Sequence, residues 1–160
     1  MKKQIANIFK NSKIVFIGVG NILRKDDGVG PYVASGAMRA APCVNKNYNF
    51  IDAGEAPENY IGSIAAYKPD AAVIIYALHF KAAPGAMEII NADKARKTTF
   101  STHGMPLELF AQRLKEAANA KIFLLGIQPA SLNLSEGLTR PVKIAADRLI
   151  KLICEEMKNA

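Results

Sequence analysis

The sequence has little of several residue types on which common activities depend. Its 160 residues include no tryptophan, two cysteines and two histidines, and aromatic residues make up only 8%. Cys43 and Cys154 lie far apart and outside any CxxC motif, so they give neither a disulfide framework nor a paired-cysteine metal site. This use of cysteine is typical of a reducing compartment, and we expect a cytoplasmic protein whose thiols are packed or partly buried.

Several targeting and catalytic motifs are also missing. The sequence has no apolar run of about 18 residues and no charged-then-apolar leader with a small-residue cleavage site, so we expect no membrane insertion and no secretion. Neither Gly-x-Ser-x-Gly nor His-Glu-x-x-His occurs, which argues against a serine esterase or an ordinary zinc peptidase. Leu23 stands where the dinucleotide-binding motif has its third glycine, and no Gly-Lys-Ser/Thr follows, so nucleotide binding is disfavoured.

The formal net charge of +7 does not by itself indicate a nucleic-acid-binding protein. Lysines and arginines are spread along the chain instead of forming one basic stripe. We therefore interpret most of them as a solvated surface and expect no nucleic-acid partner. A basic face that binds an acidic protein stays open as the alternative.

Short apolar runs alternate with helical patterns along the chain, which predicts an α/β fold. Strands are expected at residues 13–17, 49–54, 71–76, 86–90 and 121–126, and helices at 31–41, 57–69, 107–117 and 142–153. The gap that contains Pro84-Gly85 is too short for a helical crossover, so 71–76 and 86–90 should run antiparallel. The remaining strands should form a parallel sheet with both faces covered. We expect a single domain over residues 1–160, with a basic lead-in at 1–12.

The stretch 18–31 joins the first predicted strand to the first predicted helix. Its four glycines allow tight backbone turns, and Pro31 suits the first helical position. Asp26 and Asp27 lie side by side in this stretch, and they could form a solvated pair or a favourable charge at the helix start. Two adjacent like charges gain little from such an arrangement, so we expect at least one carboxylate to point inward.

Three polar side chains should meet at one edge of the sheet. Asp27 follows the first strand, His79 follows the strand 71–76, and His103 precedes the helix 107–117. In α/β folds, functional sites gather at the carboxyl ends of strands. Each histidine alone could be a surface or capping residue, but a carboxylate with two imidazoles suits a borderline divalent metal. We therefore name Asp27, His79 and His103 as candidate metal ligands.

Several blocks of the sequence together resemble the nickel-iron hydrogenase maturation endopeptidases. They are Gly18 to Leu23, Asp26 to Pro31, Gly54 to Asn59, Pro84-Gly85, Thr102 to Leu107 and Gly126 to Pro129, within a collinear match from about residue 13 to 150. The resemblance implies a three-layer sandwich: a twisted five-stranded, mostly parallel sheet, with one antiparallel strand, between helices on both faces. It also implies a cytoplasmic peptidase that removes the C-terminal extension of a hydrogenase large-subunit precursor.

The same resemblance implies that the precursor supplies the nickel, which Asp27, His103 and an aspartate at the end of the central strand would contact, and that Asp27 and His103 are the catalytic residues. Here that strand ends in Ile75-Tyr76-Ala77, so Tyr76 stands in place of the aspartate. A phenol with a pKa near 10 does not replace a carboxylate ligand at neutral pH. Either His79 supplies the missing ligand, or the protein binds a hydrogenase-like subunit or its metal without cleaving it.

Overall fold

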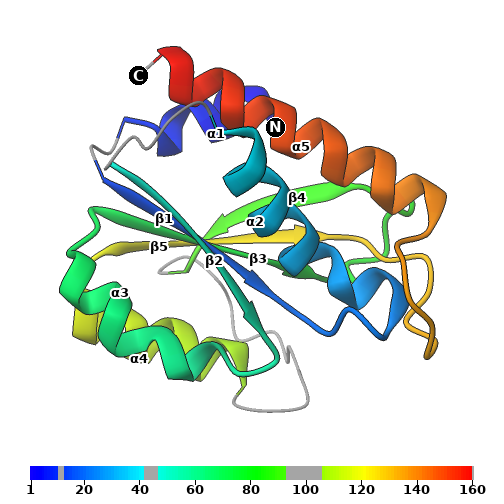
Figure 1. The fold of residues 1–160 in the computed structure, drawn as a ribbon, viewed down its shortest axis with the longest axis horizontal. Helices are drawn as coiled ribbons and strands as arrows, with labels where there is room; N and C mark the ends of the chain where they lie inside the picture. Colours follow the sequence, from blue (N-terminus) through cyan, green and yellow to red (C-terminus); the bar gives the residue numbers. More distant parts are fainter. Residues whose placement is uncertain (11–12, 42–46, 93–105, 160) are drawn as a thin grey trace.

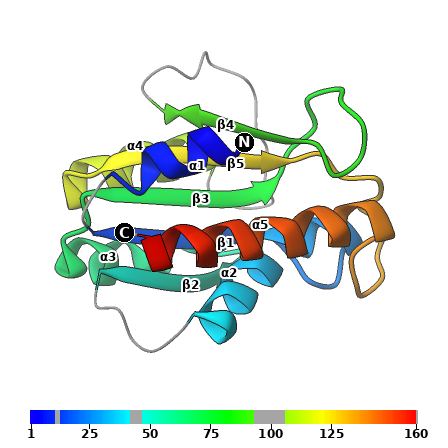
Figure 2. The same ribbon diagram turned by 90° about the horizontal axis from the view of Figure 1, so that it is seen from above.

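A five-stranded sheet lies between two layers of helices in the computed structural model, which describes residues 1–10, 13–41, 47–92 and 106–159 (Figures 1 and 2). The strands are β1 (Ile14–Val19), β2 (Tyr48–Gly54), β3 (Ala71–Ala77), β4 (Met87–Asn91) and β5 (Lys121–Ile127). Their order is β2-β1-β3-β5-β4, and only the β4–β5 pair is antiparallel. The predicted fold class is therefore confirmed.

The predicted relative direction of two strands is confirmed, and the structure shows which strand lies between them. The strand 86–90 was expected antiparallel to 71–76, and β4 does run against the direction of β3. The two strands are not neighbours, however, because β5 is inserted between them. β4 is therefore an outer strand of the sheet, and its Glu88 is exposed. In β1, by contrast, every residue is buried. Continuous burial explains why β1 is apolar throughout, since both faces of a central parallel strand are covered.

Helices cover the two faces of the sheet as separate apolar clusters. One face packs against α1 (Lys2–Ile8), α2 (Val29–Ala40) and α5 (Arg140–Asn159), and the other packs against α3 (Ile61–Tyr67) and α4 (Leu107–Ala118). Successive strand residues alternate between the clusters, as Phe16 and Ile17 do. No helix within the described ranges is both long and apolar enough to span a bilayer.

Several element boundaries differ from the sequence-based expectation. The basic lead-in folds as α1, which buries Ile5 and Ile8 in the core. The segment expected as one helix at 57–69 is a 3-10 turn, Pro57–Tyr60, followed by α3. Of the two cysteines, Cys154 is half-buried as expected, and burial raises the pKa of its thiol. Cys43 lies outside the described residues.

Gly30 lets the start of α2 approach the ends of β1 and β3. A Cβ atom at this position would lie 2.2 Å from the carbonyl oxygen of Ile75 and 2.5 Å from that of Val19. Only glycine fits such a close contact between backbone segments. The glycine-rich stretch therefore seats α2 directly on the carboxyl ends of the two central strands.

Candidate active site

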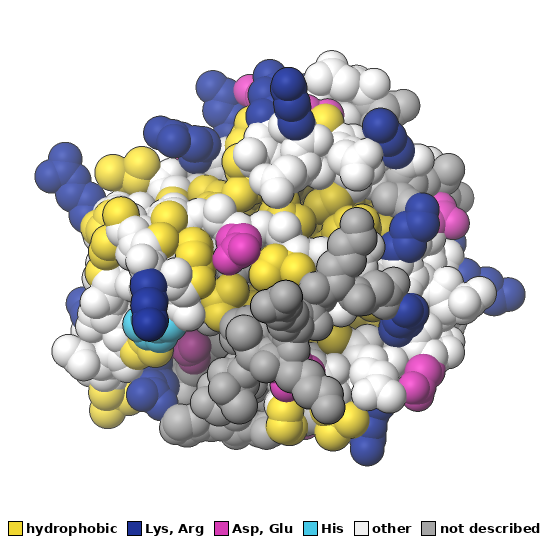
Figure 3. All heavy atoms as spheres, turned by 180° about the vertical axis from the view of Figure 1, so that it is seen from behind, with side chains coloured by type: hydrophobic (Ala, Val, Ile, Leu, Met, Phe, Trp, Pro, Cys, Tyr) yellow, Lys and Arg dark blue, Asp and Glu magenta, His cyan; other side chains and the backbone are white. Residues whose placement is uncertain are grey.

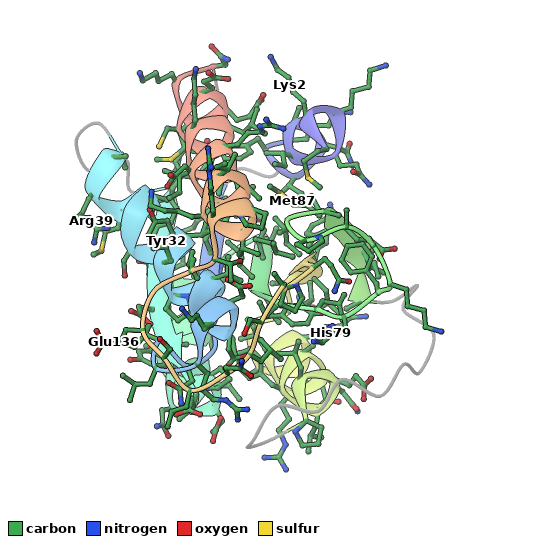
Figure 4. The ribbon with its side chains drawn as sticks, turned by 90° about the vertical axis from the view of Figure 1, so that its right-hand side faces the viewer. Lys2, Tyr32, Arg39, His79, Met87 and Glu136 are labelled. Atoms are coloured by element: carbon green, nitrogen blue, oxygen red, sulfur yellow. The ribbon has the colours of Figure 1, made fainter. Side chains whose placement is uncertain are left out.

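The carboxyl ends of the parallel strands lie together at one end of the sheet, which we call the carboxyl edge. Figure 4 views this end of the sheet almost directly. A 3-10 turn, Lys25–Gly28, follows β1 at this edge and carries both Asp26 and Asp27. The loop after β5 passes across the same edge and is joined to the β1 loop by a bridge between Arg24 and Ser135. The loops after β1 and after β5 therefore form the surroundings of the predicted site residues at the carboxyl edge.

Asp26 is the inward-pointing carboxylate. It is 0% exposed, and its two oxygens accept four hydrogen bonds from the loop after β5. The donors are the backbone N–H groups of Ala130 (2.8 Å), Ser131 (3.1 Å) and Thr139 (2.7 Å) and the Thr139 hydroxyl (2.8 Å). The prediction that at least one of the paired aspartates points inward is thus confirmed. Asp26 fixes the loop after β5 and leaves no oxygen for a substrate.

Asp27 presents one oxygen of its carboxylate at the edge. The side chain is half-buried, and its Oδ2 accepts a hydrogen bond from the backbone N–H of Asn21 at 2.9 Å. Within the described segments, Oδ1 accepts none. Gly20, with a φ of +141°, lies so close that a Cβ there would be 1.8 Å from the Asp27 carbonyl oxygen. The backbone of Asp27 is therefore held firmly, while one carboxylate oxygen has no hydrogen-bond donor among the described residues.

Tyr76 lies in β3 and is only 3% exposed, packed in the apolar cluster beneath α3 and α4. Gly126 pairs with Tyr76 on one side and with Glu88 on the other, so the three residues form one row across the sheet. Burial is the main reason that the pKa of Tyr76 is raised well above its ordinary value, and the charges of Glu88 and Glu108 raise this pKa further. The phenol consequently stays neutral and cannot act as an anionic ligand at neutral pH.

His79 is exposed and follows the end of β3. Its Nδ1 lies 3.2 Å from Nε2 of Gln128. The orientation of the Gln128 amide is set by its Oε1, which accepts backbone N–H groups from Phe80 at 2.8 Å and Ala82 at 3.3 Å. The Gln128 NH₂ group therefore donates to Nδ1, which places the proton of neutral His79 on Nε2. In this arrangement neither ring nitrogen offers a free lone pair to a metal.

The three predicted ligands, Asp27, His79 and His103, have different outcomes in the structure. Asp27 lies at the expected edge, and His79 lies toward α4 and β4, away from Tyr32 and Arg39 of α2 (Figure 4). His103 falls outside the described residues. Among the residues that are described, no group of three His, Cys, Asp or Glu side chains is placed to hold a metal. Gln128 belongs to the block Gly126 to Pro129 that carries the family resemblance, but the sequence did not indicate its contact with His79.

Comparisons with known proteins agree with this architecture. A family model described as a hydrogenase maturation protease, HycI, matches residues 34–156. The hydrogenase 3 maturation protease of Escherichia coli is 37% identical over 134 residues, with 83% of each chain covered. The crystal structure of the nickel-iron hydrogenase maturation protease HycI from Thermococcus kodakarensis KOD1 has a TM-score of 0.88 and 36% identity, covering 97% of this chain and 99% of that one. The solution structure of the endopeptidase HycI from Escherichia coli has a TM-score of 0.76 and 33% identity, covering 89% and 90%.

Proposed function

The chain belongs to the hydrogenase maturation protease family, and from this premise we propose that it is a cytoplasmic endopeptidase acting on a hydrogenase large-subunit precursor. It removes the C-terminal extension of that precursor after nickel has been inserted. The observation that best supports this proposal is the position of Asp27, whose backbone is fixed at the carboxyl edge while its Oδ1 stays available.

The proposed cleavage uses Asp27 as a base. A water oxygen attacks the carbonyl carbon of the scissile amide, and the proton that the water loses passes to the Asp27 carboxylate and then to the departing amine. Asp27 needs one unoccupied oxygen for this role, and Oδ1 meets the requirement. The same oxygen could bind nickel instead, and the precursor would then supply both the metal and the scissile bond. Holding the two together provides proximity without a covalent intermediate.

Nickel in this proposal is part of the substrate. His103 and His79 bind it, and Asp27 is the further ligand in the alternative in which the metal, instead of the Asp27 carboxylate, activates the water. A precursor without nickel lacks the shared ion and should bind weakly, so cleavage follows metal insertion. His79 can join through Nε2 if its proton moves to Nδ1, because a metal needs a nitrogen lone pair. That shift requires the Gln128 amide to turn away or to be replaced by an acceptor.

A second candidate function is favoured by Tyr76, which is buried and neutral where the family resemblance implies an aspartate. In this alternative, the protein binds a hydrogenase-like subunit or its metal without cleaving the chain. The fold and the edge residues would then serve recognition alone.

Incubation with a purified, nickel-loaded precursor distinguishes the two functions. We expect mass spectrometry to detect loss of the C-terminal extension, and we expect the nickel-free precursor to remain intact. A stable complex of unchanged mass, seen by size-exclusion chromatography, would instead support the non-cleaving alternative. Neither cleavage nor complex formation would contradict both.

Gln128→Glu tests whether His79 is the missing ligand. A carboxylate at this position can accept a proton from Nδ1, which leaves the lone pair of His79 on Nε2 for the metal. Partners of this kind change metal affinity by about 10- to 100-fold. We therefore expect Gln128→Glu to bind Ni²⁺ at least about tenfold more tightly than the wild type in isothermal titration calorimetry.

The matched control is the same substitution in a His79→Ala background. If His79 is the ligand, the gain disappears in the double variant. An equal gain in both backgrounds would mean that the new carboxylate itself attracts the ion, and His79 would then be removed from the ligand set.

A further inference from the structure

A groove of about 400 Å³ lies beside α2, and we call it the α2 groove. One wall is formed by Ile22, Lys25 and Gly28 of the loop that carries Asp27. Tyr32 and Arg39 line the groove along α2, and Leu138 of the loop after β5 also lines it. Its volume lies within the range of roughly 300–1,000 Å³ that is usual for ligand pockets in proteins.

The charges of the α2 groove are only partly neutralised by neighbours. Lys143 forms an ion pair with Asp147 at 2.7 Å, and the Asp52 carboxylate accepts hydrogen bonds from Ser35 and Gly54. Lys25 and Arg39, by contrast, make no ion pair with any described residue. Glu136, exposed in the loop after β5, is on the same side of the molecule as Arg39 and carries the opposite charge (Figure 4). Among the described residues, two cations of the α2 groove therefore have no ion-pair partner.

The spacing of these two cations constrains the ligand. Lys25 lies just before α2 and Arg39 lies in its last turn, so roughly 15 Å of helix separates them at about 1.5 Å per residue. An extended peptide rises about 3.3 Å per residue and covers that length in about five residues. On the face in Figure 3, lysine and arginine side chains gather at the top and are scattered over the rest of the surface.

Large apolar side chains are exposed on the two loops that contribute residues to the α2 groove. Ile22 is 60% exposed and Leu23 48% exposed, and Leu134 of the loop after β5 is 84% exposed. The two loops that present them are joined by backbone hydrogen bonds from Ser135 N–H to Leu23 and from Lys25 N–H to Ser135. Exposed aliphatic side chains on neighbouring, mutually fixed loops are typical of a protein interaction surface.

We propose that the α2 groove binds an extended, acidic segment of the protein substrate, with aliphatic side chains between its carboxylates. This inference rests on the proposed function, because it assigns the recognition of that same substrate. Acidic groups pair with Lys25 and Arg39, while aliphatic groups contact Ile22 and Leu138. Gly28 lines the α2 groove and directly follows Asp27, so a segment bound there leads to the candidate catalytic carboxylate. A second copy of this chain is disfavoured as the occupant because its net charge is +7.

The test compares two double charge reversals. Lys25→Glu/Arg39→Glu changes the α2 groove, and Lys2→Glu/Lys3→Glu makes the same change in net charge on the exposed side of α1. Binding to the purified, nickel-loaded precursor is measured by biolayer interferometry at low and high salt. Since like charges in an interface are strongly unfavourable, we expect the first variant to bind about tenfold or more weakly and to lose most of the salt dependence. The second variant should bind within about twofold of the wild type.

Glu136→Lys should change the affinity for the precursor in the opposite direction. Glu136 directly precedes Gly137 and Leu138 of the α2 groove, so replacing its carboxylate by a cation should tighten binding of an acidic segment, whereas a damaged fold could only weaken it. Circular dichroism melting curves check that the charge-reversed variants remain folded.

The possible failures are distinguishable. If the wild type does not bind the precursor, both the proposed function and the groove assignment fall. If the wild type binds and Lys25→Glu/Arg39→Glu binds equally well, the groove assignment alone is overturned. A change in sedimentation behaviour of the variants without precursor would make a second copy of the chain the occupant, which also overturns it.

Discussion

Asp27→Ala is expected to cleave the nickel-loaded precursor about 10²- to 10⁴-fold more slowly than the wild type, the usual contribution of a positioned acid or base. The substitution removes Oδ1, the carboxylate oxygen that accepts no hydrogen bond from the described residues and that serves as the proposed base. It also removes the acceptor for the Asn21 N–H, but that donor lies in a partly exposed loop where water can replace the carboxylate. Cleavage is followed by mass spectrometry, with a melting curve to confirm that the variant is folded.

Asp27→Asn separates the chemical role from the structural one. Its side-chain carbonyl can still accept the Asn21 N–H, while the amide cannot take a proton from water. We expect this variant to match the wild type in stability and Asp27→Ala in rate. Asp70→Ala serves as the control because Asp70 lies before β3 at the opposite edge of the sheet. If either Asp27 variant cleaved at the wild-type rate, Asp27 would have no catalytic role.

The strands were predictable because their apolar runs report burial directly. Ala71 to Tyr76 is buried without interruption, and β3 is a central strand with covered faces. The place of β4 was not predictable from the short connection after β3. Chain direction follows from a local turn, but neighbour relations depend on which strand best fills the interior. The run Ile122 to Ile127 is more apolar than β4, and it occupies the interior place.

The site was harder to predict because its contacts join distant segments. The sequence indicated that at least one of two adjacent aspartates points inward, but the choice of Asp26 depends on donors more than 100 residues away. Likewise, the tautomer of His79 is set by Gln128, 49 residues later. Local patterns cannot show such pairings. The assignment of His103 remains a prediction from the sequence.

Asp26→Ala is expected to lower the free energy of unfolding by about 4 kcal/mol, because it leaves four donors without their acceptor at about 1 kcal/mol each. The side chain is fully buried, so solvent does not replace it as it could at Asp27. Urea denaturation measures the effect as a lower midpoint with an unchanged m-value. A loss below about 1 kcal/mol would mean that the loop after β5 is held by other contacts.

Thr139→Val tests one of the four hydrogen bonds to Asp26. It removes the hydroxyl donor and keeps the backbone N–H of residue 139, which also donates to Asp26. We expect a loss of about 1 kcal/mol, the value for a single hydrogen bond. In the Asp26→Ala background the same substitution should have almost no effect, because the hydroxyl has already lost its acceptor. Such non-additivity would assign the stabilisation to the contact between the two side chains. The loop after β5 also carries Leu138 of the α2 groove. Asp26→Ala should therefore weaken precursor binding as well, although Asp26 itself does not line the groove.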